Sequence, residues 1–294
     1  MSKKRVSKGL KTADCFIYFV VLFWVIITVY PFLNVIAVSI SSYHAYLENP
    51  LRIIPGEITF EAYVNVFMNE LLFTTFKNTV IITSVHVLLV LVMCVITAYP
   101  LSLSYFRGKG LIMKYILITM LFNGGLIPNF YLIRSIRLYN TLGALFIFGL
   151  CPAFYIILTK NFFESIPNSL LDAAAIDGAS HLTIVFKIIV PVSKSILATL
   201  VVFTSVGKWN SFFDAIVYTR ESSKWTLMVL LREILMSSEA RRQMYGELEF
   251  PSAFMNPIMV KDAAIIIMVF PIIIIYPFLQ KYFIKGVMLG AIKE

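Results

Sequence analysis

The chain has few charged residues for its length. Charged side chains make up 14% of its 294 residues, and hydrophobic side chains make up 59%. A typical soluble domain has about 25% charged and roughly 45–50% apolar residues, so this chain is more apolar than a soluble core of its size needs. We therefore predict an integral membrane protein.

Cysteines are also scarce, and the three that occur are far apart in the sequence. Cys15, Cys94 and Cys151 each lie alone within an apolar segment. An odd number of isolated cysteines indicates neither a disulfide framework nor a zinc site. We expect the three thiols to be packing residues, and we predict no metal site.

Motifs typical of enzymes and of nucleic-acid-binding proteins are missing. There is no Gly-x-x-x-x-Gly-Lys-Ser/Thr phosphate-binding loop and no His-Glu-x-x-His metal motif. No basic stripe interleaved with aromatic residues lies on a segment long enough to fold alone, as a nucleic-acid-binding module requires. The net charge of +9 comes instead from short basic flanks that meet anionic lipid head groups. We predict no enzymatic activity, no cofactor in this chain and no nucleic-acid partner.

What the sequence does contain is a series of long apolar segments. The hydrocarbon core of a bilayer is about 30 Å thick, and a helix that rises about 1.5 Å per residue crosses it with about 20 apolar residues. The segments are continuous rather than alternating, which favours helices over barrel strands. We predict an all-α integral membrane protein with six transmembrane helices, at residues 15–40, 78–103, 111–126, 142–158, 191–213 and 263–283.

Charges near the ends of the chain indicate its orientation. Residues 1–13 contain several lysines and arginines and no acid, and short basic flanks of this kind stay in the cytoplasm. The first apolar segment continues without a small-residue cleavage site, so we expect it to be retained as a span. Six crossings place both termini in the cytoplasm, with a transmembrane domain over residues 14–283 and a tail over residues 284–294. Arg134 and Arg137, on the outer side in this topology, run against the charge bias.

Residues 164–191, between the fourth and fifth segments, predict a pair of helices on the cytoplasmic side. Ser165 and Pro167 suit the start of a first helix over residues 170–176, because serine caps orphan amides and proline is tolerated in the first turn. Asp177-Gly178 predicts the turn that follows, since glycine readily adopts a positive φ.

The second half of this loop adds features of a docking surface. Ser180 can cap a helix over residues 182–190, and Pro191 marks the entry into the fifth segment. The alanines at positions 173–175 remove side-chain bulk so that another surface can approach closely, and the flanking aspartates offer it negative charge. The alternative is a plain alanine-rich connector.

The spacing of these residues matches a family signature. The order is acid-Ala-Ala, three residues, Gly, nine residues, Ile, one residue, an aliphatic residue and Pro. In this chain the residues are Asp172-Ala173-Ala174, Gly178, Ile188, Val190 and Pro191. The pattern resembles the cytoplasmic loop of permease subunits of ATP-binding-cassette importers. The acid is aspartate where the family usually has glutamate, which is one carbon longer.

Other segments resemble one branch of that family, the carbohydrate-uptake permeases that serve oligosaccharides. They are Gly124-Gly125-Leu126-Ile127-Pro128, Tyr139-Asn140-Thr141, Asn161-Phe162-Phe163, Ser165-Ile166-Pro167, Trp209-Asn210 and Gly286-Val287-Met288-Leu289-Gly290-Ala291. Together with the loop signature, they extend the resemblance over almost the whole chain.

The resemblance implies a multi-subunit importer in the bacterial plasma (inner) membrane. In that family two permeases pair, two ATPase subunits bind ATP-Mg and dock on the cytoplasmic loops, and an extracytoplasmic solute-binding protein delivers the sugar. Such a chain hydrolyses no ATP itself. The residues implied for ATPase coupling are Asp172, Ala173, Ala174, Asp177, Gly178, Phe186 and Pro191.

A short polar and aromatic stretch, Lys208-Trp209-Asn210, lies inside the fifth segment. A lysine at such depth is costly unless it faces a wet cavity or a partner charge. We expect Trp209 to stack on a sugar ring, Asn210 to bind hydroxyl groups, and Lys208 to pair with the carboxylate of an acidic, uronate-containing sugar. In the alternative, Lys208 snorkels to the lipid head groups and Trp209 anchors the helix at the interface.

Polar residues also interrupt the third segment near its outer end. Asn123 and Asn129 lie beside Gly124-Gly125, and polar backbone at this depth occurs where a cavity is lined. They are candidates for the substrate path as part of a re-entrant element, and an ordinary outer loop is the alternative. His86, on an apolar run, is expected to be packed with its ring nitrogen satisfied.

The outer loop between the fifth and sixth segments, about residues 214–261, has room for a small subdomain. Within it, Leu227, Leu230 and Ile234 recur at three-to-four-residue spacing, which predicts an amphipathic surface helix over residues 225–236. In this interpretation the helix caps the transport path or contacts a partner.

The main rival interpretation is an ion-coupled secondary transporter or channel subunit. Such a protein is expected to carry acidic residues in its spans. Residues 15–40, 78–103 and 263–283 contain none, which favours a permease subunit driven by a separate ATPase and importing a sugar or oligosaccharide.

Overall fold

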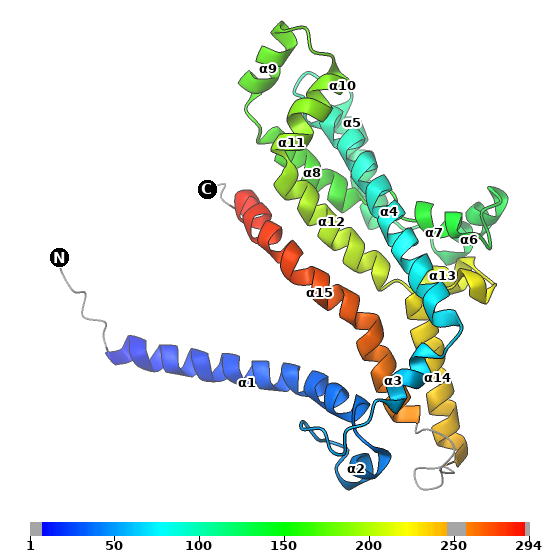
Figure 1. Cartoon of the computed structure of the whole chain (residues 1–294). Coiled ribbons are helices and arrows are strands. Elements are labelled where there is room, and N and C mark those ends of the chain that lie inside the picture. Colours follow the sequence, from blue (N-terminus) through cyan, green and yellow to red (C-terminus); the bar gives the residue numbers. More distant parts are fainter. Residues whose placement is uncertain (1–7, 246–256, 292–294) are drawn as a thin grey trace. The chain divides into compact units, whose positions relative to one another are not determined.

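The computed structural model describes residues 8–245 and 257–291. Figure 1 shows that these residues are almost entirely helical, and their one extended pairing is a bridge between Ser41 and Ile58. The predicted all-α fold is confirmed. Parts of the predicted termini and of the predicted outer loop fall on residues 1–7, 246–256 and 292–294, outside the described residues.

The chain divides into two compact units, of which the first contains residues 1–69 and 231–268. Its longest helix, α1 (Lys8–Ser39), is apolar and largely exposed, as the outward-facing Phe16 and Trp24 show. A helix that is apolar all round lies either in a large core or in a membrane. Two short helices follow it, α2 (Tyr43–Glu48) and α3 (Glu61–Phe67).

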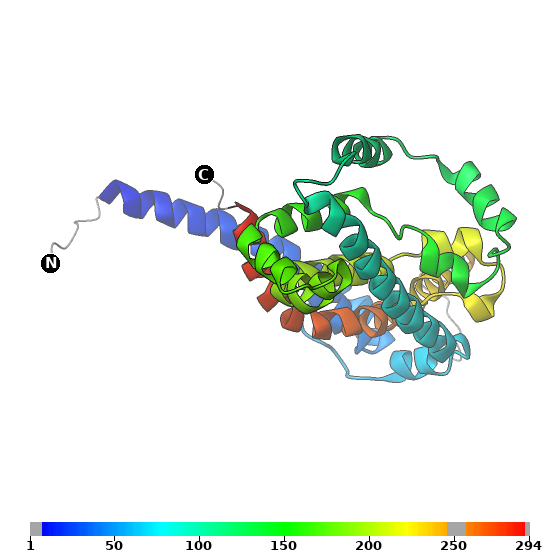
Figure 2. The same ribbon diagram turned by 90° about the horizontal axis from the view of Figure 1, so that it is seen from above.

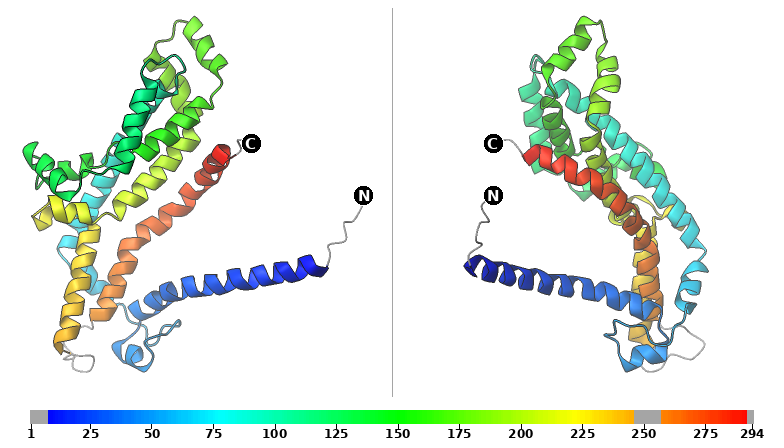
Figure 3. Two further views of the ribbon diagram at one scale, coloured as in Figure 1. Left: turned by 180° about the vertical axis from the view of Figure 1, so that it is seen from behind. Right: turned by 60° about the vertical axis from the view of Figure 1, so that its left-hand side comes forward.

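The second unit contains residues 70–230 and 269–294, and α4 (Leu71–Ser102) is its central helix. Two further helices, α8 (Ala153–Glu164) and α12 (Lys194–Trp209), pack along α4 (Figure 3). The buried residues of α4 recur every three or four positions, as one face of a helix requires. They include Leu72, Thr75, Thr79, Ile82, His86 and Val90.

Shorter helices complete the second unit. They are α5 (Lys109–Leu121), α6 (Leu126–Ser135), α7 (Leu142–Ile147), α13 (Phe213–Tyr218) and η2 (Ser222–Lys224). Two more helices, α14 (Leu227–Tyr245) and α15 (Pro257–Ala291), contribute residues to both units. The predicted helix over residues 225–236 is therefore present as the first part of α14, and Leu227 and Leu230 lie on its buried side.

Three helices of the described chain are long and apolar enough to cross a membrane. They contain the stretches Asp14–Ser39, Leu71–Ser102 and Ile258–Ile275, and they correspond to the predicted first, second and sixth spans. Two bent pairs raise the number of candidate spans to five if each pair counts as one. In one pair, α5 and α6 meet at 113° and run in different directions (Figure 2); in the other, the stretch His181–Val192 meets α12 at 79°.

The predicted fourth span, residues 142–158, is not one continuous helix. It is divided between α7 and α8, because the chain leaves the helix at Phe148 and resumes it after Pro152. Gly149 adopts φ +80° in this break, a value that glycine accepts without steric cost. Apolar composition alone did not reveal the interruption.

Candidate functional site

The helical pair predicted at residues 164–191 forms one end of the second unit (Figures 1 and 3). Its first helix is α9 (Asn168–Ile176), and Asp177 and Gly178 make the turn that follows. Gly178 has φ +78° with nothing within 4 Å of where a Cβ would lie. Glycine is therefore needed there for its backbone conformation and not for space.

The predicted role of Ser165 at the start of α9 is wrong. Ser165 ends α8, and its hydroxyl donates a hydrogen bond to the carbonyl of Phe162 at 2.6 Å. α9 instead begins after Pro167, whose extended conformation occupies the cap position. The serine belongs to the preceding helix because α8 continues to Glu164, directly before it.

The second helix of the pair begins as predicted at Ser180, whose hydroxyl accepts from the Thr183 amide at 3.3 Å. It comprises α10 (His181–Ile184), the π-helical turn η1 (Val185–Ile189) and α11 (Val190–Val192). Proline has no N–H group, so Pro191 cannot bond the carbonyl one turn before it. The Val190 amide reaches five residues back to Val185. The expected direct entry into the fifth span is thus interrupted by the 79° bend after Val192.

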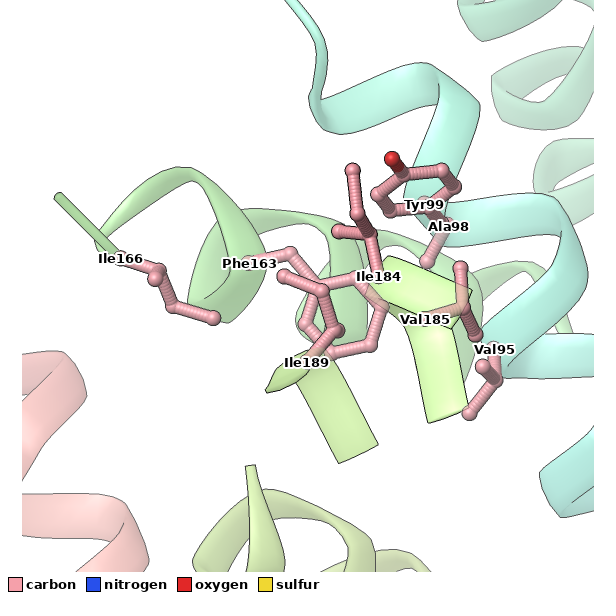
Figure 4. Packing of buried hydrophobic residues seen from close by; sticks show 8 residues of the cluster. All are labelled: Val95, Ala98, Tyr99, Phe163, Ile166, Ile184, Val185 and Ile189. Carbon is pink, nitrogen blue, oxygen red and sulfur yellow. The ribbon is translucent and has the colours of Figure 1, made fainter. Parts of the chain in front are cut away.

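An apolar cluster attaches the helical pair to the rest of the second unit (Figure 4). Its buried members come from α4, from α8, from the short segment between α8 and α9, and from the second helix of the pair. They are Val95, Ala98, Tyr99, Phe163, Ile166, Ile184, Val185 and Ile189. Leu171 and Ala174 of α9 pack against the cluster, so α9 is held by one side only.

The opposite side of the helical pair is an exposed apolar surface. Ile176 is 86% exposed, Leu182 is 71% exposed and Phe186 is 62% exposed. Large exposed apolar side chains of this kind make the helical pair a candidate interaction site. The predicted coupling residues Asp172, Ala173, Asp177, Gly178, Phe186 and Pro191 are all exposed, whereas Ala174 is half-buried on the cluster side.

Lys208, predicted to lie in the substrate path, is buried near the end of α12 with 9% exposure. Its amine lies 3.5 Å from the Asp214 carboxylate at the start of α13. Ser211 donates a hydrogen bond to the same carboxylate oxygen at 3.1 Å. The partner charge that a buried lysine requires is therefore Asp214, which sequence reasoning missed although it lies only six residues away.

Trp209 and Asn210 have separate surroundings. The Trp209 ring packs edge to face on Phe76, with centroids 6.1 Å apart. Asn210 is exposed, and its side-chain amide donates to the carbonyl of Val206 at 3.0 Å. The predicted trio therefore does not form one surface, because its members are directed to different neighbours.

Trp209 lines a cavity of about 410 Å³ within the second unit. Most of its wall is aliphatic and comes from Val80, Val87, Val201, Val206, Pro271 and Ile275. Ser84 and Ser205 also line the cavity, and each carries a hydroxyl group. The lining thus combines two aromatic rings, those of Trp209 and Phe76, with few polar groups.

Asn123 and Asn129 lie at the break between α5 and α6. The Asn123 side chain accepts from the Gly125 amide at 2.9 Å, and Gly125 has φ +85°. Asn129 is half-buried in α6. Neither residue lines the cavity beside Trp209, but the 113° bend that they flank is the geometry of a broken span or a re-entrant loop.

Two expectations for single residues have different outcomes. His86 is buried, and its Nδ1 lies 2.7 Å from the carbonyl of Phe146, which only accepts, so the predicted packed and satisfied histidine is confirmed. The cysteines are free, but only Cys94 is buried, while Cys15 and Cys151 are exposed. The expectation of packing thiols is therefore correct for Cys94 alone.

The described residues thus contain long apolar helices and a helical pair with exposed apolar side chains. Residues 62–289 match the family described as binding-protein-dependent transport system inner membrane component. The chain belongs to this family, which is a transport component and not an ATPase. The predicted family is confirmed.

Individual relatives agree with this assignment. The polygalacturonan/rhamnogalacturonan transport system permease protein YtcP of Bacillus subtilis (strain 168) is 35% identical over 95% of this chain and 98% of its own length. Protein LplC of the same organism is 34% identical over 91% of this chain and 90% of its own length. A chain in the crystal structure of a bacterial ABC transporter involved in the import of the acidic polysaccharide alginate is similar at TM-score 0.84 and 31% identity, covering 96% of this chain and 100% of that one.

Proposed function

We propose that this chain is one of two permease subunits of an ATP-driven importer for acidic oligosaccharides in the bacterial inner membrane. The observation that carries the proposal is that the polygalacturonan/rhamnogalacturonan permease and the alginate transporter chain are both similar to it over almost its whole length. Polygalacturonan and alginate are both polymers of uronic acids, so each presents one carboxylate per sugar unit.

The proposed assembly contains this chain, a second permease, two ATPase subunits that bind ATP-Mg, and an extracytoplasmic binding protein that delivers the substrate. The chain crosses the membrane six times, with the broken segment α7–α8 providing the crossing between the two bent pairs. Both termini and the helical pair are then cytoplasmic, as the basic residues near the start of the chain favour.

The exposed side of the helical pair is the proposed docking surface for the ATPase. Ile176, Leu182 and Phe186 project from it, and burial of such side chains is the usual driving force for association. Ala173 adds no bulk at the surface, which allows a close approach, and Asp172 and Asp177 add negative charge. Gly178 holds the turn, and Pro191 sets the start of the bend toward α12.

The proposed substrate path includes Lys208. The Lys208 amine lies 3.5 Å from the Asp214 carboxylate, and the proposal is that it exchanges this partner for a substrate carboxylate during transport. Trp209 offers an aromatic face to a sugar ring. Asn210, Asn123 and Asn129 are the proposed hydroxyl-binding residues in other parts of the path.

The test is import by the complete complex in proteoliposomes, with galacturonate and neutral galactose oligomers offered in parallel. ATP hydrolysis is expected to rise when the loaded binding protein is added. Lys208→Met is expected to lower import of the acidic oligomer about tenfold relative to the neutral one, because a charge-assisted contact is lost. Lys208→Arg retains the preference, and Lys194→Met, at the exposed start of the same helix, is the matched control.

Two results contradict the proposal in different ways. Import that continues without ATP and collapses with an ionophore establishes the ion-coupled alternative. If the unsubstituted chain and Lys208→Met both import acidic and neutral oligomers equally well, the substrate is not specifically acidic. The assignment as an ATP-driven permease is unaffected by that result.

A further inference from the structure

The contacts between the helical pair and α4 include a directional polar one. The Tyr99 hydroxyl lies 2.9 Å from Nδ1 of His181, and the two rings meet edge to face with centroids 5.9 Å apart. Tyr99 is buried in the last turn of α4, and His181 is the first residue of α10. Residues 82 positions apart in the sequence are thereby joined at the start of the second helix.

This contact constrains the pair in a way that the apolar cluster does not. Apolar burial is non-directional, so the cluster of Ile184, Val185 and Ile189 against α4 tolerates small rotations of the second helix about its axis. A hydrogen bond weakens steeply away from its preferred angle. The bond between Tyr99 and His181 therefore fixes the rotation of α10 relative to α4.

Two routes lead from the helical pair toward the cavity beside Trp209, and they differ in stiffness. The route along the chain passes through η1, Pro191 and the 79° bend into α12. At that bend the Ser193 hydroxyl is fully buried and has no hydrogen-bond partner. Helices α11 and α12 are separate there, with Ser193 between them, so a displacement must pass through a bend rather than along one continuous helix.

The second route is α4 itself, which is one continuous helix from Leu71 to Ser102. Tyr99 lies near its end at the helical pair, while Phe76, Val80 and Val87 line the cavity toward its other end. At about 1.5 Å per residue, Tyr99 and Phe76 are roughly 35 Å apart along the axis. Pro100 removes one backbone hydrogen bond in the turn that contains Tyr99, but α4 stays helical from that turn to the cavity wall. A displacement applied at Tyr99 thus reaches the wall along a single helix.

We propose that Tyr99 and His181 are a positioning pair that transmits movement of the helical pair to α4 and so to the cavity wall beside Trp209. The proposal rests on the coupling role proposed above for the helical pair. Neither residue contacts nucleotide or reacting atoms in this account. Their function is to couple movement of the docked helical pair to transport. Loss of the pair is therefore expected to leave ATP hydrolysis less well coupled to oligosaccharide import.

The experiment measures oligosaccharide imported per ATP hydrolysed by the complete complex in proteoliposomes. Tyr99→Phe removes only the hydroxyl and is expected to lower this ratio about fivefold, the factor that corresponds to one neutral hydrogen bond. ATPase subunits remain bound at the level of the unsubstituted chain, because the exposed docking side is unchanged. Tyr105→Phe, which removes the same atom from an exposed tyrosine, is the matched control.

Substitutions of His181 separate positioning from folding. His181→Asn places an oxygen close to the position of Nδ1 and is expected to keep the ratio within about twofold of normal, whereas His181→Gln, whose amide lies further out, is expected to behave as Tyr99→Phe. The double substitution of Tyr99→Phe with His181→Gln is expected to be no worse than either alone, since both remove one shared interaction.

The outcomes are distinct from those that test the proposed function. If the unsubstituted complex imports with ATP and Tyr99→Phe gives the same ratio, the positioning role is overturned while the permease assignment stands. If Tyr99→Phe and His181→Gln both prevent assembly of the complex, the pair serves folding and the proposal is likewise overturned.

Discussion

At the scale of single residues, Glu164 joins two parts of the second unit. Its carboxylate lies 2.5 Å from the amine of Lys109 at the start of α5 and 2.6 Å from that of Lys160 one turn earlier in α8. Partial burial alone raises the pKa of Glu164, but the hydrogen bonds from the two lysines outweigh it, so the pKa is lowered. The charged carboxylate is therefore the form that the fold stabilises.

A carboxylate with a lowered pKa in the folded state adds stability above its unfolded pKa, about 4.3 for glutamate, and loses it as the pH falls through the folded value. Glu164→Gln is expected to destabilise the chain by about 1 kcal/mol at neutral pH, a modest value because all three groups are partly solvated. The difference is expected to shrink below about pH 4. Thermal unfolding in detergent at several pH values measures it.

Glu233→Gln, which neutralises an exposed carboxylate in α14, is the control for a general effect of charge. If Glu164→Gln and the control lower the unfolding temperature equally, or if the difference grows at acid pH, the assigned role of Glu164 is incorrect.

At the scale of elements, local rules predicted what depends on local sequence. The Asp177-Gly178 turn and the Ser180 cap are present because positive φ and a side-chain oxygen beside an orphan amide are decided within a few residues. The break inside α7–α8 and the π-helical turn before Pro191 were not predicted, since apolar composition is the same on both sides of each.

The candidate site shows the same limit. Asp214 could have been noticed as the acid nearest to Lys208, but the end of α12 lies between them, and helical spacing gives no rule across a helix end. The contact between Tyr99 and His181 depends on how α10 packs on α4. No periodicity within one segment reports such a contact.

The helical pair makes a prediction about docking. Phe186→Ala is expected to reduce co-purification of the ATPase about tenfold, because an exposed aromatic side chain is removed from the centre of the proposed interface. Folding is expected to be unaffected, since the Phe186 ring is 62% exposed. The measurement is the amount of ATPase recovered with the tagged permease complex from detergent.

Tyr105→Ala, a comparably exposed aromatic residue outside the helical pair, is the control. Full recovery of the ATPase with Phe186→Ala places the docking surface elsewhere on the chain. Loss of the permease itself from the membrane instead assigns Phe186 a role in folding, which also contradicts a docking role.

At the scale of the whole molecule, the proposed function requires a particular arrangement across the membrane. The ATPase works in the cytoplasm, so the helical pair must be there, and the loop between α13 and α14 must then face outward, one crossing away. Within residues 8–245 and 257–291, length and composition define up to five candidate spans, if each bent pair counts as one. Whether the number of crossings is even therefore depends on the broken segment α7–α8. If that segment does not cross, the chain has an odd number of crossings and its termini lie on opposite sides of the membrane, which contradicts the proposal that both are cytoplasmic.

Cysteine accessibility tests this arrangement directly. In a chain whose three cysteines are replaced, Ala173→Cys on the exposed side of the helical pair is expected to react with a membrane-impermeant maleimide only in inside-out vesicles. Ser223→Cys, in exposed η2, is expected to react only from outside, on intact cells or right-side-out vesicles. If both positions are labelled from the same side, α12 does not cross the membrane between them. If Ala173→Cys is labelled from outside, the helical pair is not cytoplasmic and cannot be the surface on which the ATPase docks.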